Sequence, residues 1–162
     1  MMRKTVRESQ VETIEIVFPN DANPHGNIFG GRVMQFIDIV GSVSAMKHAR
    51  RAVVTASMDQ LDFKAPVKVG EVLILHASVN YVGRTSMEVG VKVMAENPLT
   101  GERRQTSTAY LTYVAVDEKG CPVEMEPIIP ETADEKRRYK EAQARRKHRL
   151  EVREQKARAK KS

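Results

Sequence analysis

The sequence has few of the features that mark secreted or membrane proteins. It contains one cysteine, Cys121, which cannot form an internal disulfide bond. No stretch combines a basic start, an apolar middle and a small-residue cleavage site, and no run approaches the ~20 consecutive apolar residues of a membrane span. These absences predict a soluble, cytoplasmic protein of one main domain that does not act at a membrane.

Several common catalytic patterns are also missing. The four histidines are scattered without metal-ligand spacing, at positions 25, 48, 76 and 148. No G-x-S-x-G turn is present, and Cys121 has no histidine near it in the sequence. We therefore expect no metal, no cofactor and no serine or cysteine nucleophile.

Positive charge is concentrated at one end of the chain. The net charge is +6, but residues 131–162 carry 13 Lys/Arg and 6 Asp/Glu, which leaves a net charge of −1 on the part before them. Such a distribution bears on partners and solubility, not on fold. We expect a domain over residues 1–130 and a basic tail over 131–162, a solvated helix packed lightly if at all. We do not expect nucleic acid as a partner of the domain.

Hydrophobic periodicity predicts a mixed α and β fold. Residues 11–18 alternate as a half-buried strand with Ile14, Ile16 and Phe18 on its buried side. After a loop rich in Pro and Asn, the period indicates a helix over residues 30–47 that is apolar on most sides. Period-two patterns then predict strands at 52–64, 71–82, 85–96 and 104–116. Because the connections are short, we expect a five-stranded antiparallel sheet wrapped around one central helix, followed by a charged C-terminal helix.

One carboxylate stands out in the helical segment. Asp38 lies in an apolar run, and Arg32 is the only other formal charge between Gly30 and Met46. Burying an unpaired carboxylate costs several kcal/mol or raises its pKa, so this position calls for a partner, a bound water or a chemical role. Asp38 is a candidate general base or nucleophile, and the alternative is a buried, hydrogen-bonded anchor.

The predicted start of this helix suits an oxyanion. Its first N–H groups are free, and the pair Gly30-Gly31 removes the side chains that would keep a ligand off the backbone. One donor of this kind lowers a barrier by about 2.7 to 4 kcal/mol. Asn27 adds a side-chain amide just before the helix start, although capping the helix is the more ordinary role for such a residue. The pair Gly30-Gly31 also has an ordinary explanation, which is close packing at the start of a helix.

These motifs together resemble a known family. The run PNDANPHGNIFGGRVMQFIDIVG, followed by LDFKAPVKVGE and YVGRTSMEV, is similar to the hotdog-fold acyl-CoA thioesterases over about residues 8 to 120. The resemblance implies the hotdog fold, in which five strands wrap a central helix. It also implies hydrolysis of acyl-CoA to a carboxylic acid and coenzyme A, with coenzyme A present only as part of the substrate and product.

The resemblance assigns roles to matching positions. It implies Asp38, Asn27 and the backbone N–H near Gly31 as the catalytic groups. By the resemblance, the turn with Arg84, Thr85 and Ser86 contacts the nucleotide end of coenzyme A. The other candidates for substrate binding come from the residues themselves: Gly30 at the open helix start, Lys64 for its charge near a strand end, and Phe63 as a side chain on which pocket depth depends. The resemblance further implies a homodimer whose sites are shared between subunits, assembling as a trimer of dimers.

Two other functions remain open from the sequence. A hotdog enoyl-thioester hydratase or dehydratase would need a histidine and an acid in the pocket, and His25 is the only histidine near enough. An acyl-CoA-binding sensor would use the basic tail to contact nucleic acid or an acidic partner. We favour the thioesterase because the combined motif is more specific than any single feature that supports either alternative.

Overall fold

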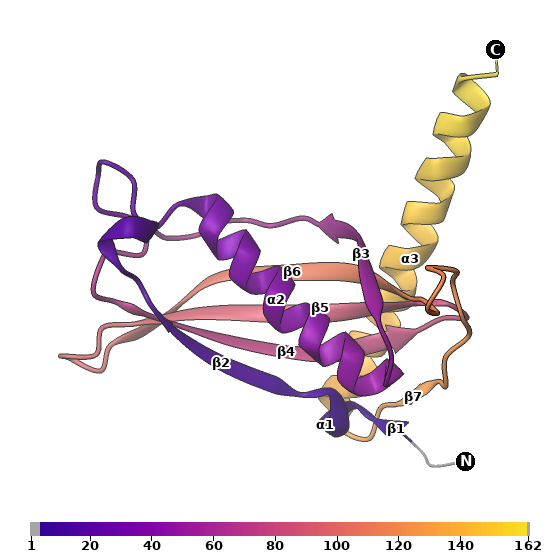
Figure 1. The fold of residues 1–162 in the computed structure, drawn as a ribbon, viewed down its shortest axis with the longest axis horizontal. Coiled ribbons are helices and arrows are strands. Elements are labelled where there is room, and N and C mark those ends of the chain that lie inside the picture. The colour runs from indigo at the N-terminus through magenta and orange to yellow at the C-terminus, as the bar shows by residue number, and fades with distance from the viewer. Residues whose placement is uncertain (1–3, 162) are drawn as a thin grey trace.

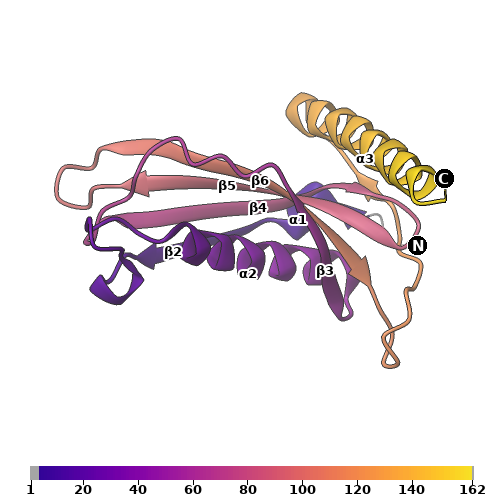
Figure 2. The same cartoon turned by 90° about the horizontal axis from the view of Figure 1, so that it is seen from above.

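A computed structural model describes residues 4–161 as a curved antiparallel sheet with one helix on each face (Figures 1 and 2). The five strands lie in the order β2-β4-β5-β6-β3. Their bounds are β2 Val11–Ile16, β3 Val53–Asp59, β4 Val72–Val82, β5 Ser86–Glu96 and β6 Arg103–Ala115. The predicted α+β class and the five-stranded antiparallel sheet are confirmed.

The central helix α2, Gly30–Ala49, lies along the concave face of the sheet (Figure 2). Its side chains Val33, Ile37 and Val40 are at most 3% exposed and pack on inward residues of β4, β5 and β6. The helix ends where Arg50 adopts the left-handed conformation, with φ 53°, and donates its N–H to Met46 O. This apolar contact holds α2 rigidly over the sheet.

The outer edge strand β2 departs from the sequence interpretation. Ile14, Ile16 and Phe18 were expected on its buried side, but their side chains are 61%, 52% and 59% exposed. Register explains the reversal, because Thr13 and Glu15 pair with Leu75 and Leu73, which face α2. Ile14 and Ile16 therefore lie on the convex face of the sheet.

The strand β3 is shorter than predicted. It ends at Asp59 and not at residue 64, because Gln60 has a φ of 32° and breaks the extended backbone. Residues 60–70 form a loop instead. Arg104 anchors this loop by donating to both carboxylate oxygens of Glu71, at 2.7 and 2.8 Å, and to Pro66 O.

Short elements that the sequence did not reveal join the two ends of the domain. They are strand β1, Lys4–Thr5, its parallel partner β7, Ile128–Ile129, and helix α1, Val6–Ser9. In α1, the buried Ser9 hydroxyl accepts from Val79 N while Ser9 O accepts from Ser44 Oγ. These bonds tie the N-terminal segment to both β4 and α2.

The C-terminal helix α3, Ala133–Ala159, was predicted as a helix, but light packing was wrong. It crosses the convex face from β4 toward β3 (Figures 1 and 2). Tyr139 packs edge-on against Tyr81 of β4, and Ala142 is fully buried. Arg145 donates to both carboxylate oxygens of Glu88 in β5. The basic tail is therefore a structural layer over half its length.

Candidate functional site

The loop before α2 forms one wall of a cavity of about 350 Å³, called here the loop cavity. Its other wall is the loop after β3, and the helix start closes one end. The residues that line it include Asn23, Asn27, Gly30, Phe63, Lys64 and Ser107. Four of the residues predicted from the sequence, Asn27, Gly30, Phe63 and Lys64, are thus brought together.

Asn23 also lines this cavity, although the sequence pattern did not single it out. Its side-chain oxygen accepts from the backbone N–H groups of His25 and Asn27, at 3.0 and 3.2 Å. This pattern fixes which side of the amide is oxygen, so the side-chain NH₂ remains the free donor. A loop containing Asn20, Asn23 and Asn27 offers no sequence signal that singles out one of them.

The start of α2 presents free backbone donors beside the cavity. Phe29 is the N-cap residue and provides no side-chain cap, so the first N–H groups of the helix, at Gly30 and Gly31, lack a helical acceptor. A side chain at Gly30 would meet the Phe63 ring at 3.2 Å, whereas a Cβ at Gly31 would enter open space. The backbone at Gly31 is therefore the more accessible of the two.

The carboxylate of Asp38 is half-buried and firmly positioned. Its Oδ1 accepts from Thr55 Oγ1 of β3 at 2.8 Å and from the phenol of Tyr113 of β6 at 3.0 Å. No donor to Oδ2 is found among residues 4–161. One oxygen thus anchors the group and the other is left for a ligand. Neither Thr55 nor Tyr113 was identified from the sequence.

Tyr113 is fully buried, and its hydroxyl fills the space beside Gly41. A Cβ at Gly41 would lie 2.5 Å from the phenol oxygen, so a glycine is required there. Burial, then the charge and hydrogen bond of Asp38, raise the pKa of Tyr113 far above its ordinary 10.0. The phenol therefore remains a hydrogen-bond donor at every physiological pH.

The loop cavity and Asp38 are separate within one chain. Asp38 lies about two helical turns beyond Gly31, which places it about 10 Å further along the helix axis. A single thioester carbon cannot contact groups that far apart. A site using both requires a second chain.

The exposed side of α2 is apolar around Asp38. Met34, Ile39, Val43 and Met46 are 37% to 52% exposed, and Val54 on the free edge strand β3 is 50% exposed. An apolar strip of this kind beside an unpaired strand edge is typical of a subunit interface.

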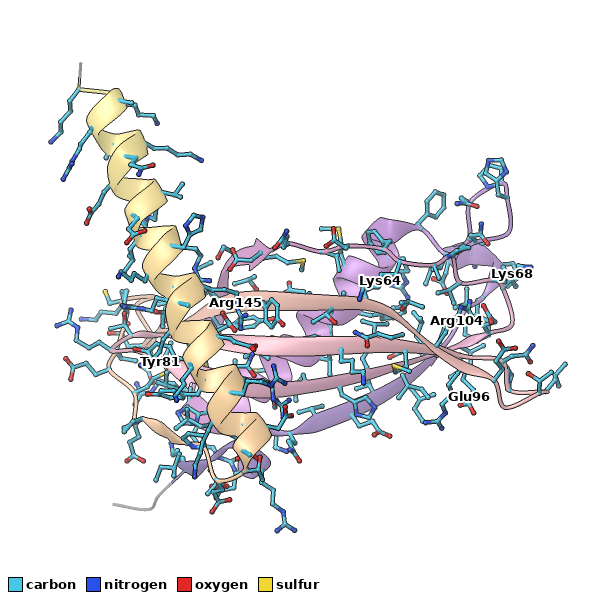
Figure 3. All side chains as sticks on the ribbon, turned by 180° about the vertical axis from the view of Figure 1, so that it is seen from behind. Lys64, Lys68, Tyr81, Glu96, Arg104 and Arg145 are labelled. Carbon is cyan, nitrogen blue, oxygen red and sulfur yellow. The ribbon has the colours of Figure 1, made fainter. Side chains whose placement is uncertain are left out.

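The other predicted coenzyme A residues lie at the opposite end of the sheet. Arg84, Thr85 and Ser86 form the turn between β4 and β5, next to α3. Figure 3 shows Lys64 far from Arg145 and Tyr81, which mark the α3 end. Arg84 is exposed, with its guanidinium 3.7 Å from Glu124, whereas Thr85 and Ser86 line a second cavity.

His25, on which the hydratase alternative depended, is exposed at the loop tip and does not line the loop cavity. Across residues 4–161 no cluster of three or more His, Cys, Asp or Glu side chains has the arrangement of a metal site. In the same range no helix has the length and apolar character needed to cross a bilayer.

Comparisons with known proteins agree on one family. Residues 25–102 match the model of the thioesterase superfamily. An uncharacterized acyl-CoA thioester hydrolase of Bacillus subtilis is 46% identical over 80% of this chain and 75% of its own. A cytosolic acyl coenzyme A thioester hydrolase of Rattus norvegicus is 33% identical over 87% of this chain, which spans 38% of that longer protein.

Solved structures of similar proteins share the whole fold. A hexameric acyl-CoA thioesterase superposes with a TM-score of 0.90 and 45% identity, covering 94% of this chain and 97% of its own. An acyl-CoA hydrolase of Staphylococcus aureus was crystallised with butyryl coenzyme A and coenzyme A. It superposes with a TM-score of 0.89 and 37% identity, covering 98% of this chain and 96% of its own. Single alanine variants of that hydrolase change an aspartate, a threonine that follows it in the chain and an asparagine that precedes it.

Proposed function

This chain belongs to the thioesterase superfamily, and from that membership we propose that it hydrolyses acyl-CoA thioesters to a carboxylic acid and coenzyme A. The observation that carries the proposal is the Asp38 carboxylate, held by two donors on one oxygen and open on the other. It lies on the central helix of a fold shared over nearly its full length with an acyl-CoA hydrolase.

We propose Asn23, in preference to Asn27, as the amide that acts with Asp38. The spacing from Asn23 to Asp38 and on to Thr55 is identical to the spacing of the asparagine, aspartate and threonine changed in the Staphylococcus aureus hydrolase. The NH₂ group of Asn23 is free to donate, because its oxygen is held by the loop backbone.

The proposed reaction needs one base and one group of donors. The Asp38 carboxylate takes a proton from a water molecule, whose oxygen attacks the thioester carbon. The backbone N–H at Gly31 and the Asn23 amide stabilise the developing oxyanion. The carbon–sulfur bond then breaks, and the proton held by Asp38 passes to the departing thiolate. Only side chains, backbone donors and water take part.

We propose that these groups meet across a dimer. The separation of about 10 Å along α2 prevents one chain from supplying both halves to one thioester. A two-fold axis beside the exposed strip on α2 and β3 would bring Asp38 of one protomer toward the loop cavity of its partner. Assembly of such dimers into hexamers is proposed from the hexameric relatives.

A cytoplasmic setting is proposed on sequence grounds alone. Acyl-CoA is its proposed substrate, and a metal or separate cofactor has no part in the reaction as written. Within α3, Arg137 and Arg138 pair with Asp134, and Arg145 pairs with Glu88 of the sheet, so part of the positive charge of the helix is neutralised.

The decisive experiment replaces the base. Asp38→Asn should lower kcat for butyryl-CoA by about 10²- to 10⁴-fold, the usual contribution of a general base. Asp62→Asn changes an exposed aspartate on the loop after β3 and serves as the matched control. Light scattering should give the same oligomer for all three proteins. Hydrolysis by Asp38→Asn at the rate of the control would rule out the proposed site.

A further inference from the structure

The segment 21–29 before α2 is a small hairpin, called here the Asn23 hairpin. Asp21 O accepts from Phe29 N at 2.9 Å, and Asn23 N donates to Asn27 O at 2.8 Å. Asn23 lines the loop cavity from one side of this hairpin. The position of its amide relative to the start of α2 therefore depends on how the hairpin is held against the helix.

The Asp21 carboxylate joins the Asn23 hairpin to the first turn of α2. Its Oδ1 accepts from Arg32 Nε at 2.8 Å, and its Oδ2 accepts from Phe18 N at 3.1 Å. Both carboxylate oxygens are thus held by donors from the two segments that flank the hairpin. The Asp21 side chain is only 11% exposed, so little water competes for it, and a hydrogen bond between charged groups is stronger than one between neutral groups.

Arg32 is itself held in one direction. Its guanidinium carbon lies 4.4 Å from the centre of the Phe36 ring, and its Nη1 donates to Gln35 Oε1 at 2.6 Å. Stacking on an aromatic ring and a second acceptor fix the plane of a guanidinium. Arg32 is the other formal charge that the sequence places in this helix beside Asp38, and the reaction proposed above gives it no role.

The remaining contacts of the Asn23 hairpin lead away from α2. Ile28 N donates to Val67 O, and Gly26 O accepts from Val69 N, so the hairpin is bonded to the loop after β3, which is the opposite wall of the loop cavity. Among residues 4–161, the pair of Asp21 with Arg32 is the only hydrogen bond between a side chain of the hairpin and a side chain of α2. Without it, the hairpin would be tied more firmly to that loop than to the helix.

We propose that Asp21 and Arg32 are positioning residues for the reaction, because their pair sets the distance between the Asn23 amide and the backbone N–H at Gly31. The inference rests on the proposed function, in which these two donors share one oxyanion. Such donors act only when they are aimed at the place where the charge develops, and a small displacement is costly in rate. Since the oxyanion exists only during the reaction, loss of the pair should lower kcat and leave KM nearly unchanged.

The kinetic experiment compares two side chains of similar length that differ by one charge. Arg32→Met should lower kcat for butyryl-CoA at least tenfold, with KM changed less than twofold. Arg32→Lys should recover part of that loss, because its ammonium can still donate to Asp21. The control is Arg103→Met, which breaks an exposed pair with Glu96 between β5 and β6 and should retain kcat.

Two kinetic results would overturn the proposal. One is a kcat for Arg32→Met equal to that of Arg103→Met. The other is a raised KM with an unchanged kcat, since that would mean that Arg32 binds the substrate directly.

A double-mutant cycle shows whether the pair acts through Asn23. In an Asn23→Ala background, Arg32→Met should lower kcat less than twofold, because the group that it positions is already gone. Asp21→Asn should reproduce Arg32→Met, since one amide oxygen cannot accept from both Arg32 and Phe18 in the observed geometry. A pair with a merely structural role would give the same fold-loss of kcat with and without the Asn23 amide, and that result would refute the positioning role.

Hydrogen exchange tests the anchor without catalysis. The amides of Asn23 and Phe29, which donate within the hairpin, should exchange at least tenfold faster in Arg32→Met than in Arg103→Met, whereas those of β5 should not change. Equal exchange in the two variants would overturn the proposal, whatever their activity. Faster exchange in a protein that does not hydrolyse butyryl-CoA would instead refute the proposed function and leave the pair as the anchor of the hairpin.

Discussion

The contact between Tyr113 and Gly41 allows a quantitative test of how Asp38 is positioned. The Tyr113 hydroxyl has one proton and two acceptors at 3.0 Å, the Asp38 carboxylate and the Asp38 carbonyl. A hydrogen bond to a charged group contributes about 1.5–3 kcal/mol, and sharing the proton favours the lower value. Since each 1.36 kcal/mol is a factor of ten in rate, Tyr113→Phe should lower kcat about tenfold.

Gly41→Ala tests the same contact from the opposite side. The new Cβ would lie 2.5 Å from the phenol oxygen but 3.3 Å from the ring carbon that bears it. Gly41→Ala alone should therefore lower both kcat and Tm, and adding Tyr113→Phe should recover much of the loss in Tm. Such non-additivity is the expected signature of two groups in direct contact.

The assay is the initial rate of coenzyme A release from butyryl-CoA, with thermal unfolding of each variant. Tyr110→Phe is the matched control, because Tyr110 lies on the same strand but faces α3, where Arg145 stacks on its ring. A kcat for Tyr113→Phe equal to that of the control would refute the positioning role. The role would also be refuted if Gly41→Ala lowered Tm by the same amount with and without the Tyr113 hydroxyl.

Two further predictions concern stability. Arg145→Ala leaves the buried Glu88 carboxylate without its main partner, at a cost of about 3–5 kcal/mol, so calorimetry should show Tm lower by about 6–20 °C. The control is Lys147→Ala, which removes an exposed cation from the same helix. A loss of Tm no larger than that of the control would contradict this prediction. Burial lowers the pKa of His48 below 6.5, although its hydrogen bond to Glu126 O partly opposes this. The unfolded chain therefore binds the extra proton, so the free energy of unfolding should fall as the pH drops below 6.5. Urea titrations of His48→Gln should show a weaker dependence between pH 7.5 and 5.5, and parallel pH slopes would count against the assignment.

The fold was largely predictable because periodicity records which face of each element is buried. The alternation of Met87, Val89, Val91 and Val93 correctly located β5, and these four side chains are at most 1% exposed. The same rule failed for β2, since alternation identifies an apolar face but not which side of the sheet it occupies. Periodicity also cannot detect a loop such as residues 60–70, which is held by the pairing of Arg104 with Glu71.

The candidate site was predictable in part. Asp38 is visible in the sequence because a lone charge in an apolar helix is anomalous. Its partners Thr55 and Tyr113 lie far along the chain, in strands where a threonine or tyrosine is ordinary. The packing of α3 was missed for a similar reason. Glu88 and Arg145 neutralise each other in space but count only as separate, distant charges in the sequence.

Two buried hydroxyls of β6 have no hydrogen-bond partner in the described chain. Ser107 Oγ and Thr112 Oγ1 are the buried side-chain atoms without partners in the described chain, and both belong to β6. Because Thr112 lies five positions beyond Ser107 along the strand, the two side chains point to opposite faces of the sheet, Ser107 toward the loop cavity and Thr112 toward the face that α3 covers. A folded chain tolerates few such atoms, so Ser107 and Thr112 are two positions where replacing the hydroxyl with an apolar group of the same shape should leave Tm unchanged or raise it. A lower Tm in Thr112→Val would show that its hydroxyl has a partner in solution.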